Sequence, residues 1–510
     1  MALRPVESAR RMSRFLGRTD GGLVQRVLRS GVWVGVQNGG QSVLQTLRSI
    51  ILARLLTPEI FGLMGLCQVA IRGLDLFTET GIAPALIHRQ DRIEEAKDTA
   101  YTLQIARGFL LALLALPLAP LAAHYYNEPQ LQNVILVLSS AFVISGFSNI
   151  NTILLQKQLD FRRLAFLELT VSLVSTIAVS VLAYIMRSVW ALVIGQILTS
   201  SLRVALTYII VPGRPTMRFD RQIAKELFRY GRFITGLTIV LFVTSEIDNM
   251  VVGKLIGFQQ LGLYTMAFTL ANLPATHIAK IASNVIFPAY SSLQKDPARI
   301  RLAYLTVLRV VSAVSMPAAA GLATLAPDLL RIVYGERWVG AAGALRILAL
   351  FGAARAIGML SGYLYNAIGK PNISFYMSGI KLAVILAIIY PLTARYGLEG
   401  AATAVAVPQV VGDAIGLLIV EGQVGLALSS ILAVLARVLA CCAVMVAVLL
   451  AGAHVLAPIG PLDLALLILA AIVVYGALSA REMRRLYDEV RQARAKKVAP
   501  TGAADTAPAQ

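Results

Sequence analysis

The feature that most constrains this chain is a succession of apolar runs, each long enough to cross a bilayer as a helix. A run of about 20 apolar residues spans the hydrocarbon core, and a helix bonds its own backbone polar groups internally. Because 57% of the 510 residues are hydrophobic and only 14% are charged, we predict an all-α integral membrane protein with about fourteen transmembrane helices. The predicted spans are 30–53, 61–87, 99–122, 130–155, 164–186, 189–211, 227–253, 259–290, 302–325, 339–367, 372–391, 397–420, 430–451 and 458–480.

The break between the first two runs returns 200 residues later, which indicates an internal duplication. Residues 52–63 read Leu-Ala-Arg-Leu-Leu-Thr-Pro-Glu-Ile-Phe-Gly-Leu, and residues 252–263 read Val-Gly-Lys-Leu-Ile-Gly-Phe-Gln-Gln-Leu-Gly-Leu. With this offset Gly62 falls on Gly262. A tight turn followed by a glycine that opens the next helix suits a close hairpin of two antiparallel membrane helices.

Two further segments extend the duplication. Tyr126-Asn-Glu matches Tyr334-Gly-Glu, and Ser188-Val-Trp-Ala-Leu loosely matches Tyr396-Gly-Leu-Glu-Gly-Ala-Ala. Each half then holds six spans, an even number, so both halves enter the membrane in the same orientation. We therefore expect two six-helix lobes around a V-shaped central cavity, with the last two spans as C-terminal additions.

The distribution of Lys and Arg predicts the topology. Thirty of these residues lie in the terminal segments and in the connections after even-numbered spans, with the connection after the sixth span counted from Arg214 to Arg232, whereas six lie in the other connections. By the positive-inside bias both termini are cytoplasmic. The predicted organisation is a basic lead at 1–29, an N-lobe of spans 1–6 at 30–213, a cytoplasmic loop at 214–226, a C-lobe of spans 7–12 at 227–420, spans 13–14 at 421–480, and a basic, disordered cytoplasmic tail at 481–510.

Several function classes find no support in the sequence. The net charge of +19 comes from basic residues in short, separate connections, which cannot form a continuous surface for nucleic acid. The three cysteines and four histidines are scattered without metal-ligand spacing, and neither a Walker A segment nor a GxSxG segment is present. We expect no metal, no cofactor and no catalytic residues.

Polar side chains recur on one face of the second span. Gln68, Arg72, Asp75 and Glu79 follow one another at helical spacing. A charge near the bilayer centre costs about 3 kcal/mol on insertion scales, so this face is expected to meet a polar interior. Two interpretations stay open: Asp75 or Glu79 neutralises Arg72 only to fix helix packing, or the stripe lines a substrate path.

Spans 1, 7 and 8 carry comparable polar positions, and ten basic residues in all fall inside predicted spans. Among these ten, Arg107, Arg309 and Arg437 lie near the predicted cytoplasmic ends, from which long side chains can extend to the headgroups. Convergence of the stripes would form one cationic cavity. The candidate substrate-binding residues are Gln45, Arg48, Gln68, Arg72, Asp75, Glu79, Asp248, Asn272, Lys280 and Arg355.

The opening hairpin, the segment Asp75-Leu-Phe-Thr-Glu-Thr-Gly-Ile-Ala-Pro-Ala-Leu-Ile-His-Arg and the segment Ser188-Val-Trp-Ala-Leu-Val carry a family resemblance. With them the chain resembles the Wzx-type polysaccharide flippases of the multidrug/oligosaccharidyl-lipid/polysaccharide exporter superfamily, in the colanic-acid-exporter-like branch. The resemblance implies that this chain is a bacterial inner-membrane protein. It implies further that the chain moves an undecaprenyl-diphosphate-linked oligosaccharide from the cytoplasmic to the periplasmic leaflet. It also implies membrane lipids, a polysaccharide polymerase and a chain-length regulator as partners.

Two other classes stay open beside the flippase. A multidrug antiporter would share the two lobes, but its cationic substrates favour carboxylates over the basic residues found here. A membrane-embedded polymerase or ligase would be an enzyme, and we would expect it to carry a large periplasmic loop with paired basic residues. No predicted connection is of that size.

Overall fold

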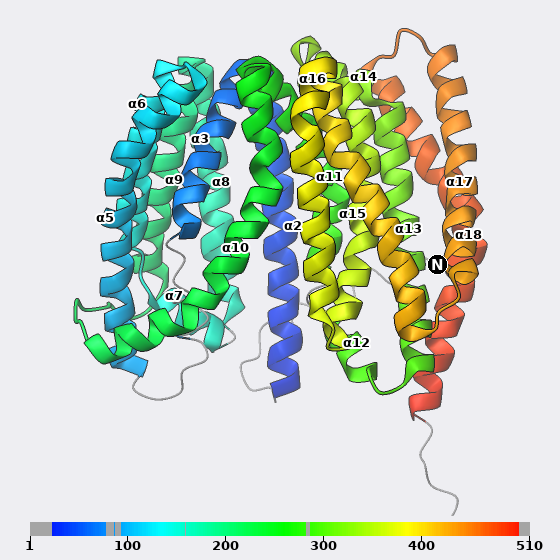
Figure 1. Ribbon diagram of the computed structural model, residues 1–510, viewed down its shortest axis with the longest axis horizontal. Helices are drawn as coiled ribbons and strands as arrows, with labels where there is room; N and C mark the ends of the chain where they lie inside the picture. The colour runs from blue at the N-terminus through cyan, green and yellow to red at the C-terminus, as the bar shows by residue number, and fades with distance from the viewer. Residues whose placement is uncertain (1–22, 78–85, 87–92, 159, 282–285, 499–510) are drawn as a thin grey trace, which may run out of the picture. The chain divides into compact units, whose positions relative to one another are not determined.

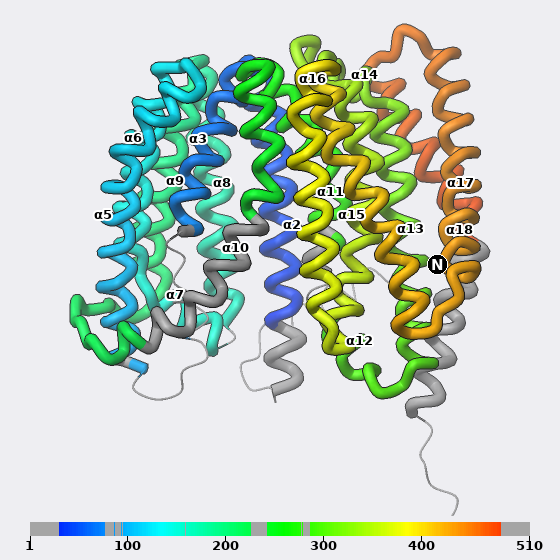
Figure 2. The backbone as a smooth tube through the Cα atoms, in the orientation of Figure 1, coloured from blue at the N-terminus to red at the C-terminus, as the bar shows by residue number. Residues whose placement is uncertain are grey.

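The computed structural model of this chain describes residues 23–77, 86, 93–158, 160–281 and 286–498, and only the backbone is described for 23–29, 94, 226–241, 277, 279–281 and 481–498. These residues form helices joined by short turns (Figure 1), and Figure 2 traces the same backbone. The helices are α2 (Leu23–Leu55), α3 (Pro58–Phe77), α5 (Ile93–Tyr126), α6 (Pro129–Gly146), α7 (Asn151–Lys157), α8 (Phe161–Met186), α9 (Val189–Ile210), α10 (Arg221–Leu255), α11 (Phe258–Ile281), α12 (Phe287–Leu293), α13 (Pro297–Thr324), α14 (Ala326–Leu329), η2 (Leu330–Tyr334), η3 (Glu336–Ala341), α15 (Ala342–Ala367), α16 (Pro371–Val424), α17 (Leu428–Val455) and α18 (Pro461–Val498).

The chain divides into two compact units, Met1–Thr265 and Met266–Gln510, which we call unit 1 and unit 2. Unit 1 holds α2 to α10 and the first turns of α11, and unit 2 holds the rest of the chain. The lobe boundary at 214–226 stays a prediction.

Within the described ranges, nine helices are long and apolar enough to cross a membrane. One of them, α16, contains two predicted spans, because the chain turns at Gly397, where φ is 57°. Four other long helices, α2, α3, α10 and α11, are the ones that carry the polar positions expected in spans 1, 2, 7 and 8. The protein is therefore a multi-pass, all-α membrane protein, and its number of spans stays a prediction.

The helix bounds repeat at the predicted offset. The first helix of the opening hairpin ends at Leu55 and its counterpart α10 ends at Leu255, whereas the second helices begin at Pro58 and Phe258. Each hairpin thus uses two residues to turn between helices. The sequence comparison located this duplicated hairpin correctly.

The two glycines at matching positions bring the hairpins together inside unit 1. A Cβ atom on Gly62 would lie 1.9 Å from the carbonyl oxygen of Phe258, and one on Gly262 would lie 1.8 Å from that of Pro58. Any side chain at either position would collide with the opposite helix backbone. The two contacts are reciprocal, as expected for a two-fold relation between the duplicated hairpins.

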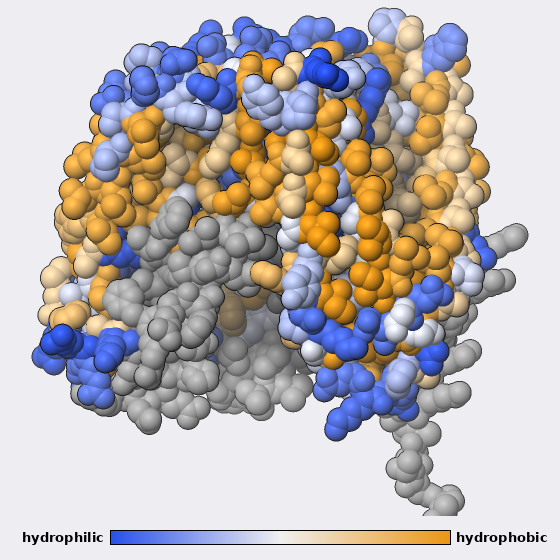
Figure 3. Space-filling model, viewed as in Figure 1, coloured by the Kyte–Doolittle hydropathy of each residue, from blue (hydrophilic) through white to orange (hydrophobic). Residues whose placement is uncertain are grey.

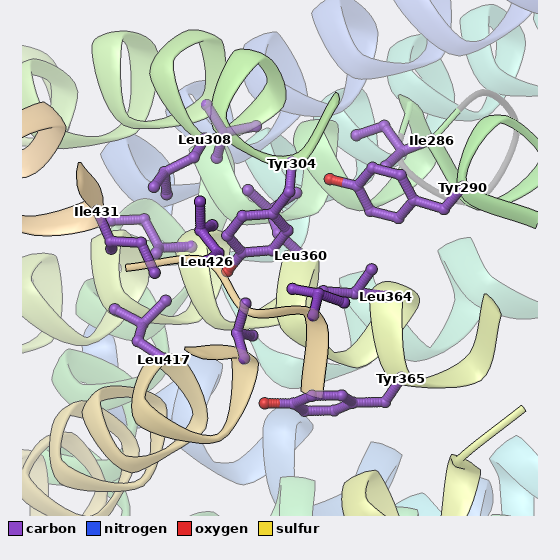
Figure 4. Close-up of a cluster of buried hydrophobic side chains, with 14 of the residues drawn as sticks. Ile286, Tyr290, Tyr304, Leu308, Leu360, Leu364, Tyr365, Leu417, Leu426 and Ile431 are labelled. Carbon is purple, nitrogen blue, oxygen red and sulfur yellow. The ribbon is translucent and has the colours of Figure 1, made fainter. Parts of the chain in front are cut away.

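Apolar side chains fill the interior of each unit. In unit 2, Tyr304, Leu360, Tyr365 and Leu417 belong to a buried cluster contributed by α13, α15 and α16 (Figure 4). Two hydroxyl groups of this cluster are bonded: Tyr304 Oη lies 2.9 Å from Ser361 Oγ, and Tyr365 Oη donates to the carbonyl oxygen of Gly416 at 2.5 Å. The buried hydroxyl of Tyr290, in the same cluster, has no hydrogen-bond partner among the described residues. Buried hydroxyls with partners keep the cluster free of desolvation cost at these atoms.

The outward-facing side chains are those of a protein in lipid. Large apolar residues such as Phe109, Leu113, Ile177 and Leu466 are exposed. On the face shown in Figure 3, hydrophobic side chains lie between hydrophilic ends on the helices of both units. Apolar area of this extent is typical of a surface that meets hydrocarbon.

Candidate functional site

The centre of the candidate site is Arg72, a residue of α3. The helix α3 packs against α10 (Figure 1). The Nη1 atom of Arg72 lies 3.0 Å from Oε1 of Glu246, and its Nε donates to the backbone oxygen of Gln68 at 3.3 Å. The Glu246 side chain is 8% exposed and the Arg72 side chain is 55% exposed. One end of this ion pair is therefore fixed in the protein, while the guanidinium stays accessible.

A second amide holds the buried carboxylate in place. Asn249 Nδ2 donates to Glu246 Oε2 at 2.9 Å, so each carboxylate oxygen has its own donor. Glu246 and Asn249 lie one helical turn apart on α10, which brings the two side chains to the same face. Glu246 therefore has a hydrogen-bond partner in addition to Arg72.

Asp75, one turn after Arg72 on α3, pairs with a different residue from the one expected. Arg107 Nη2 of α5 lies 2.7 Å from Asp75 Oδ1 and also donates to the Asp75 backbone oxygen at 2.9 Å. Asp75 is therefore not the residue that pairs with Arg72, and the other expected partner, Glu79, lies outside the described residues. That Arg107 extends to the headgroups stays a prediction. Helical spacing places Arg72 and Asp75 on one face of α3, but each forms its ion pair with a residue of a neighbouring helix, Glu246 of α10 and Arg107 of α5.

The other polar position of α10 is buried. Asp248 is 3% exposed and accepts a hydrogen bond of 2.7 Å from Tyr264 Oη of α11. Its Oδ1 also accepts from the backbone N–H of Asn249 at 2.9 Å. Asp248 thus links the two helices of the second hairpin and presents little surface to a ligand.

The polar face of α2 meets α8 and α9. Gln41 Nε2 donates to Glu168 Oε2 at 3.2 Å, and Arg203 Nη1 bonds to Glu168 Oε1. Glu168 lies on α8 and Arg203 on α9, so one carboxylate joins three helices. Gln45 is exposed on α2 and Arg48 is half-buried there.

Unit 2 contains two further polar contacts. Arg355 Nη1 of α15 donates to Asn272 Oδ1 of α11 at 3.0 Å, and Asn272 Nδ2 donates to its own helix at the Phe268 oxygen. Lys381 pairs with Asp413 across the two halves of α16, and Gln409 Nε2 donates to the same carboxylate at 2.7 Å. Asn272 is buried and Arg355 is exposed.

The structure thus brings together some of the predicted site residues and separates others. In unit 1, Gln68 and Arg72 are both exposed on α3, and Arg72 reaches Glu246 close to Asp248. In unit 2, Asn272 and Arg355 are in direct contact. Glu79 and the Lys280 side chain lie outside the described residues. That these residues contact substrate stays a prediction.

The residues that sequence reasoning missed are mostly acidic. Glu168, Glu246 and Asp413 each hold a basic residue of another helix or helix half. A carboxylate inside an apolar run is as rare as a basic residue there. Searching for such acidic residues would have supplied the partners of Arg72, Arg203 and Lys381.

The arrangement at Arg72 suits the recognition of a phosphate-type anion. A guanidinium presents paired N–H donors in a plane and can bond two oxygens of one phosphate at once. Only the Glu246 end of this ion pair is buried, so the exposed Arg72 side chain can offer its donors to a ligand.

Comparisons with known proteins show the family of this chain. The family described as "Polysaccharide biosynthesis protein" matches residues 51–343. The teichuronic acid biosynthesis protein TuaB of Bacillus subtilis is 26% identical over 363 residues, covering 71% of this chain and 75% of that protein. The lipopolysaccharide biosynthesis protein WzxC of Escherichia coli is 26% identical over 333 residues, covering 65% of this chain and 68% of that protein.

A solved structure shares the fold. The lipid II flippase MurJ in an inward closed conformation superposes with a TM-score of 0.70 and 16% sequence identity. The match covers 89% of this chain and 99% of that one. At this identity the likeness concerns the arrangement of helices alone.

Proposed function

Because this chain belongs to the polysaccharide biosynthesis protein family, we propose that it is a flippase for a lipid-linked oligosaccharide. Its substrate would be a repeat unit carried on undecaprenyl diphosphate, and alternating access would move it from the cytoplasmic to the periplasmic leaflet. The product would enter exopolysaccharide, capsule or O-antigen synthesis. The names of the relatives TuaB and WzxC, which refer to teichuronic acid and lipopolysaccharide synthesis, support this class of substrate.

The observation that carries the proposal is the exposed guanidinium of Arg72 beside a buried carboxylate. A diphosphate offers more negative charge than a single carboxylate, and it can accept both N–H donors of one guanidinium face. Arg72 would leave Glu246 for the diphosphate on binding. Glu246 would then keep the amide of Asn249 as its partner.

Two observations weigh against a multidrug antiporter. The carboxylates of Asp75, Glu246 and Asp413 are each paired with a basic side chain. Asp248 is buried against Tyr264. A cationic drug would have to displace these bases, whereas an anionic substrate would be attracted to the accessible ones.

We propose the bacterial inner membrane as the location, with both termini in the cytoplasm. The support is the asymmetry of Lys and Arg between the two sets of connections. We also propose that the protein is not an enzyme and that a polysaccharide polymerase and a chain-length regulator act with it on the translocated repeat unit.

The test is deletion of the gene followed by complementation. Deletion should abolish a surface polysaccharide and cause lipid-linked repeat units to accumulate on the cytoplasmic leaflet. Arg72→Gln should fail to restore export at normal membrane abundance, with a loss of about 100-fold, because charged hydrogen bonds contribute about 3 kcal/mol. Arg72→Lys should restore part of it, since one ammonium cannot reproduce a bidentate contact.

Arg437→Gln is the matched control. Arg437 is exposed on α17 near a predicted cytoplasmic end, and its replacement should leave export unchanged. Full export by Arg72→Gln would refute the role of Arg72. Normal polysaccharide in the deletion strain, combined with lost drug resistance, would favour the antiporter.

A further inference from the structure

Unit 1 contains a cavity of about 370 Å³ at the end of the helices where α3 begins. Its lining comes from four connections: α2 to α3, α5 to α6, α8 to α9, and α10 to α11. Each of these connections follows an odd-numbered predicted span. All four are therefore on the side that the charge distribution assigns to the periplasm. The residues that give the cavity its chemistry are Thr57, Glu59, Glu128, Arg187, Trp190 and Phe258.

The polar residues of this cavity combine hydrogen-bond acceptors with donors. Glu59 stands in the first turn of α3, and Glu128 caps α6, where it accepts from the backbone N–H of Gln130 at 3.3 Å. A carboxylate has several acceptor positions, so Glu128 can bond a ligand hydroxyl in addition to this amide. Arg187, from the connection between α8 and α9, also lines the cavity and carries guanidinium donors. Its Cζ atom lies 6.0 Å from the centroid of the Tyr184 ring.

The aromatic residues supply an apolar surface. Trp190 and Phe258 are half-buried at the cavity wall, with Leu63 buried beside them. Aromatic rings give a large apolar contact area, and the indole keeps one N–H donor for a polar ligand. A wall of this kind next to carboxylates suits the alternating C–H and O–H groups of a sugar ring.

The backbone at and next to this cavity has positive φ at two non-glycine residues. In the described part of the chain, the non-glycine residues with positive φ are Asn127, at 55°, and Arg187, at 46°. In the matching segments of the second half, Gly335 takes the place of Asn127 with a φ of 109°, and Gly397, two residues after the position that matches Arg187, has a φ of 57°. A left-handed arginine costs about 1 kcal/mol that glycine avoids, and such strain gathers at functional sites.

From this geometry we infer that the cavity binds a sugar residue of the translocated glycan on the periplasmic side. The inference rests on the proposed flippase function and extends it. The cavity lies near the small end of the range for ligand pockets, about 300 to 1,000 Å³, which suits a single sugar residue. Two carboxylates against one guanidinium favour a neutral or N-acetylated sugar over an acidic one.

The test uses the purified full-length protein in nanodiscs and saturation-transfer difference NMR. The probes are methyl β-glucoside, N-acetylglucosamine and glucuronate, each as the free sugar. We expect saturation transfer to the two uncharged sugars and a weaker response from glucuronate. Trp190→Ala and Glu128→Gln should each lower the affinity for the uncharged sugars about tenfold, the effect of losing one charged hydrogen bond or a stacked ring.

Matched controls come from unit 2, where Glu336 and Tyr396 are an exposed carboxylate and an exposed ring. Glu336→Gln and Tyr396→Ala should bind the sugars as the unchanged protein does. Trp190→Phe keeps an aromatic ring, so it should retain most of the binding lost in Trp190→Ala. This variant separates loss of the sugar contact from loss of folding.

Three results would overturn the inference. These are no saturation transfer with any probe, equal transfer in the unchanged protein and both cavity variants, or stronger transfer to glucuronate. The export assay on Arg72→Gln reports separately on the flippase proposal. If the protein binds sugar but Arg72→Gln exports normally, the sugar site stands and the proposed role of Arg72 fails. If Arg72→Gln loses export but the unchanged protein binds no sugar, only the sugar site fails.

Discussion

Arg72 in unit 1 and Lys381 in unit 2 are both basic residues inside predicted spans, and their surroundings differ. Their acidic partners are buried to nearly the same degree, with Glu246 8% exposed and Asp413 10% exposed. The bases themselves are not alike, since the Arg72 side chain is 55% exposed and that of Lys381 is 17% exposed. Exposure of the base therefore separates a pair that can open to a ligand from one that holds helices together.

The packing around the second pair supports this distinction. A Cβ atom on Gly412 would lie 2.3 Å from Lys381 Cε, and one on Gly358 would lie 2.1 Å from Asp413 Oδ1. The pair thus occupies space that two glycines leave open on α16 and α15. By contrast, more than half of the Arg72 side chain is exposed.

The largest expected effect on stability comes from breaking the enclosed pair. Lys381→Met should lower the free energy of unfolding by about 3 to 5 kcal/mol, because it leaves the Asp413 carboxylate buried without its main countercharge. Chemical denaturation of the detergent-solubilised protein measures this loss. Gln409 would remain as the only described partner of that carboxylate.

The double variant Lys381→Met with Asp413→Leu is the control for this prediction. Replacing both members by apolar residues of similar size should recover most of the lost stability, since no unpaired charge remains. A double variant as unstable as Lys381→Met alone would show that packing rather than charge determines the loss.

A smaller effect is expected at the pair between Arg107 and Asp75. Asp75 is 54% exposed and Arg107 is 27% exposed, so solvent screens this pair more strongly than the pair at Lys381. Arg107→Gln should change the free energy of unfolding by at most about 1 kcal/mol. A loss of stability as large as that of Lys381→Met in the same denaturation experiment would contradict the comparison.

The sequence predicted the fold in considerable detail where local chemistry decides it. The turn after Leu55 and the repeated turn after Leu255 follow from the offset between matching segments. The sequence also repeats a Leu-Ala-Pro tripeptide, at residues 118–120 and 325–327. The two copies differ in structure, since α5 continues through Pro120, whereas α13 ends at Thr324 and Pro327 lies in the first turn of α14. A proline is tolerated inside a helix or at its first turn, so the tripeptide alone does not distinguish these outcomes.

The candidate site was predictable only in part. Helical spacing identified the face of α3 that carries Arg72, because that face depends on one helix. The partner Glu246 depends on how α3 packs against α10, and this contact between distant segments leaves no periodic signal in either helix. The cavity at Trp190 is formed by four connections, so its lining became visible only once the helices were assembled.

The most direct measurement of the central claim is the affinity of purified variants for undecaprenyl diphosphate. If Arg72 exchanges Glu246 for a diphosphate, the two anions compete for one guanidinium, and removing the carboxylate should help the ligand. Glu246→Gln should therefore bind the lipid more tightly than the unchanged protein, Arg72→Gln should bind it about 10 to 100-fold more weakly, and the distant control Glu336→Gln should not change the affinity. Weaker binding by Glu246→Gln, or unchanged binding by Arg72→Gln, would contradict the exchange of partners.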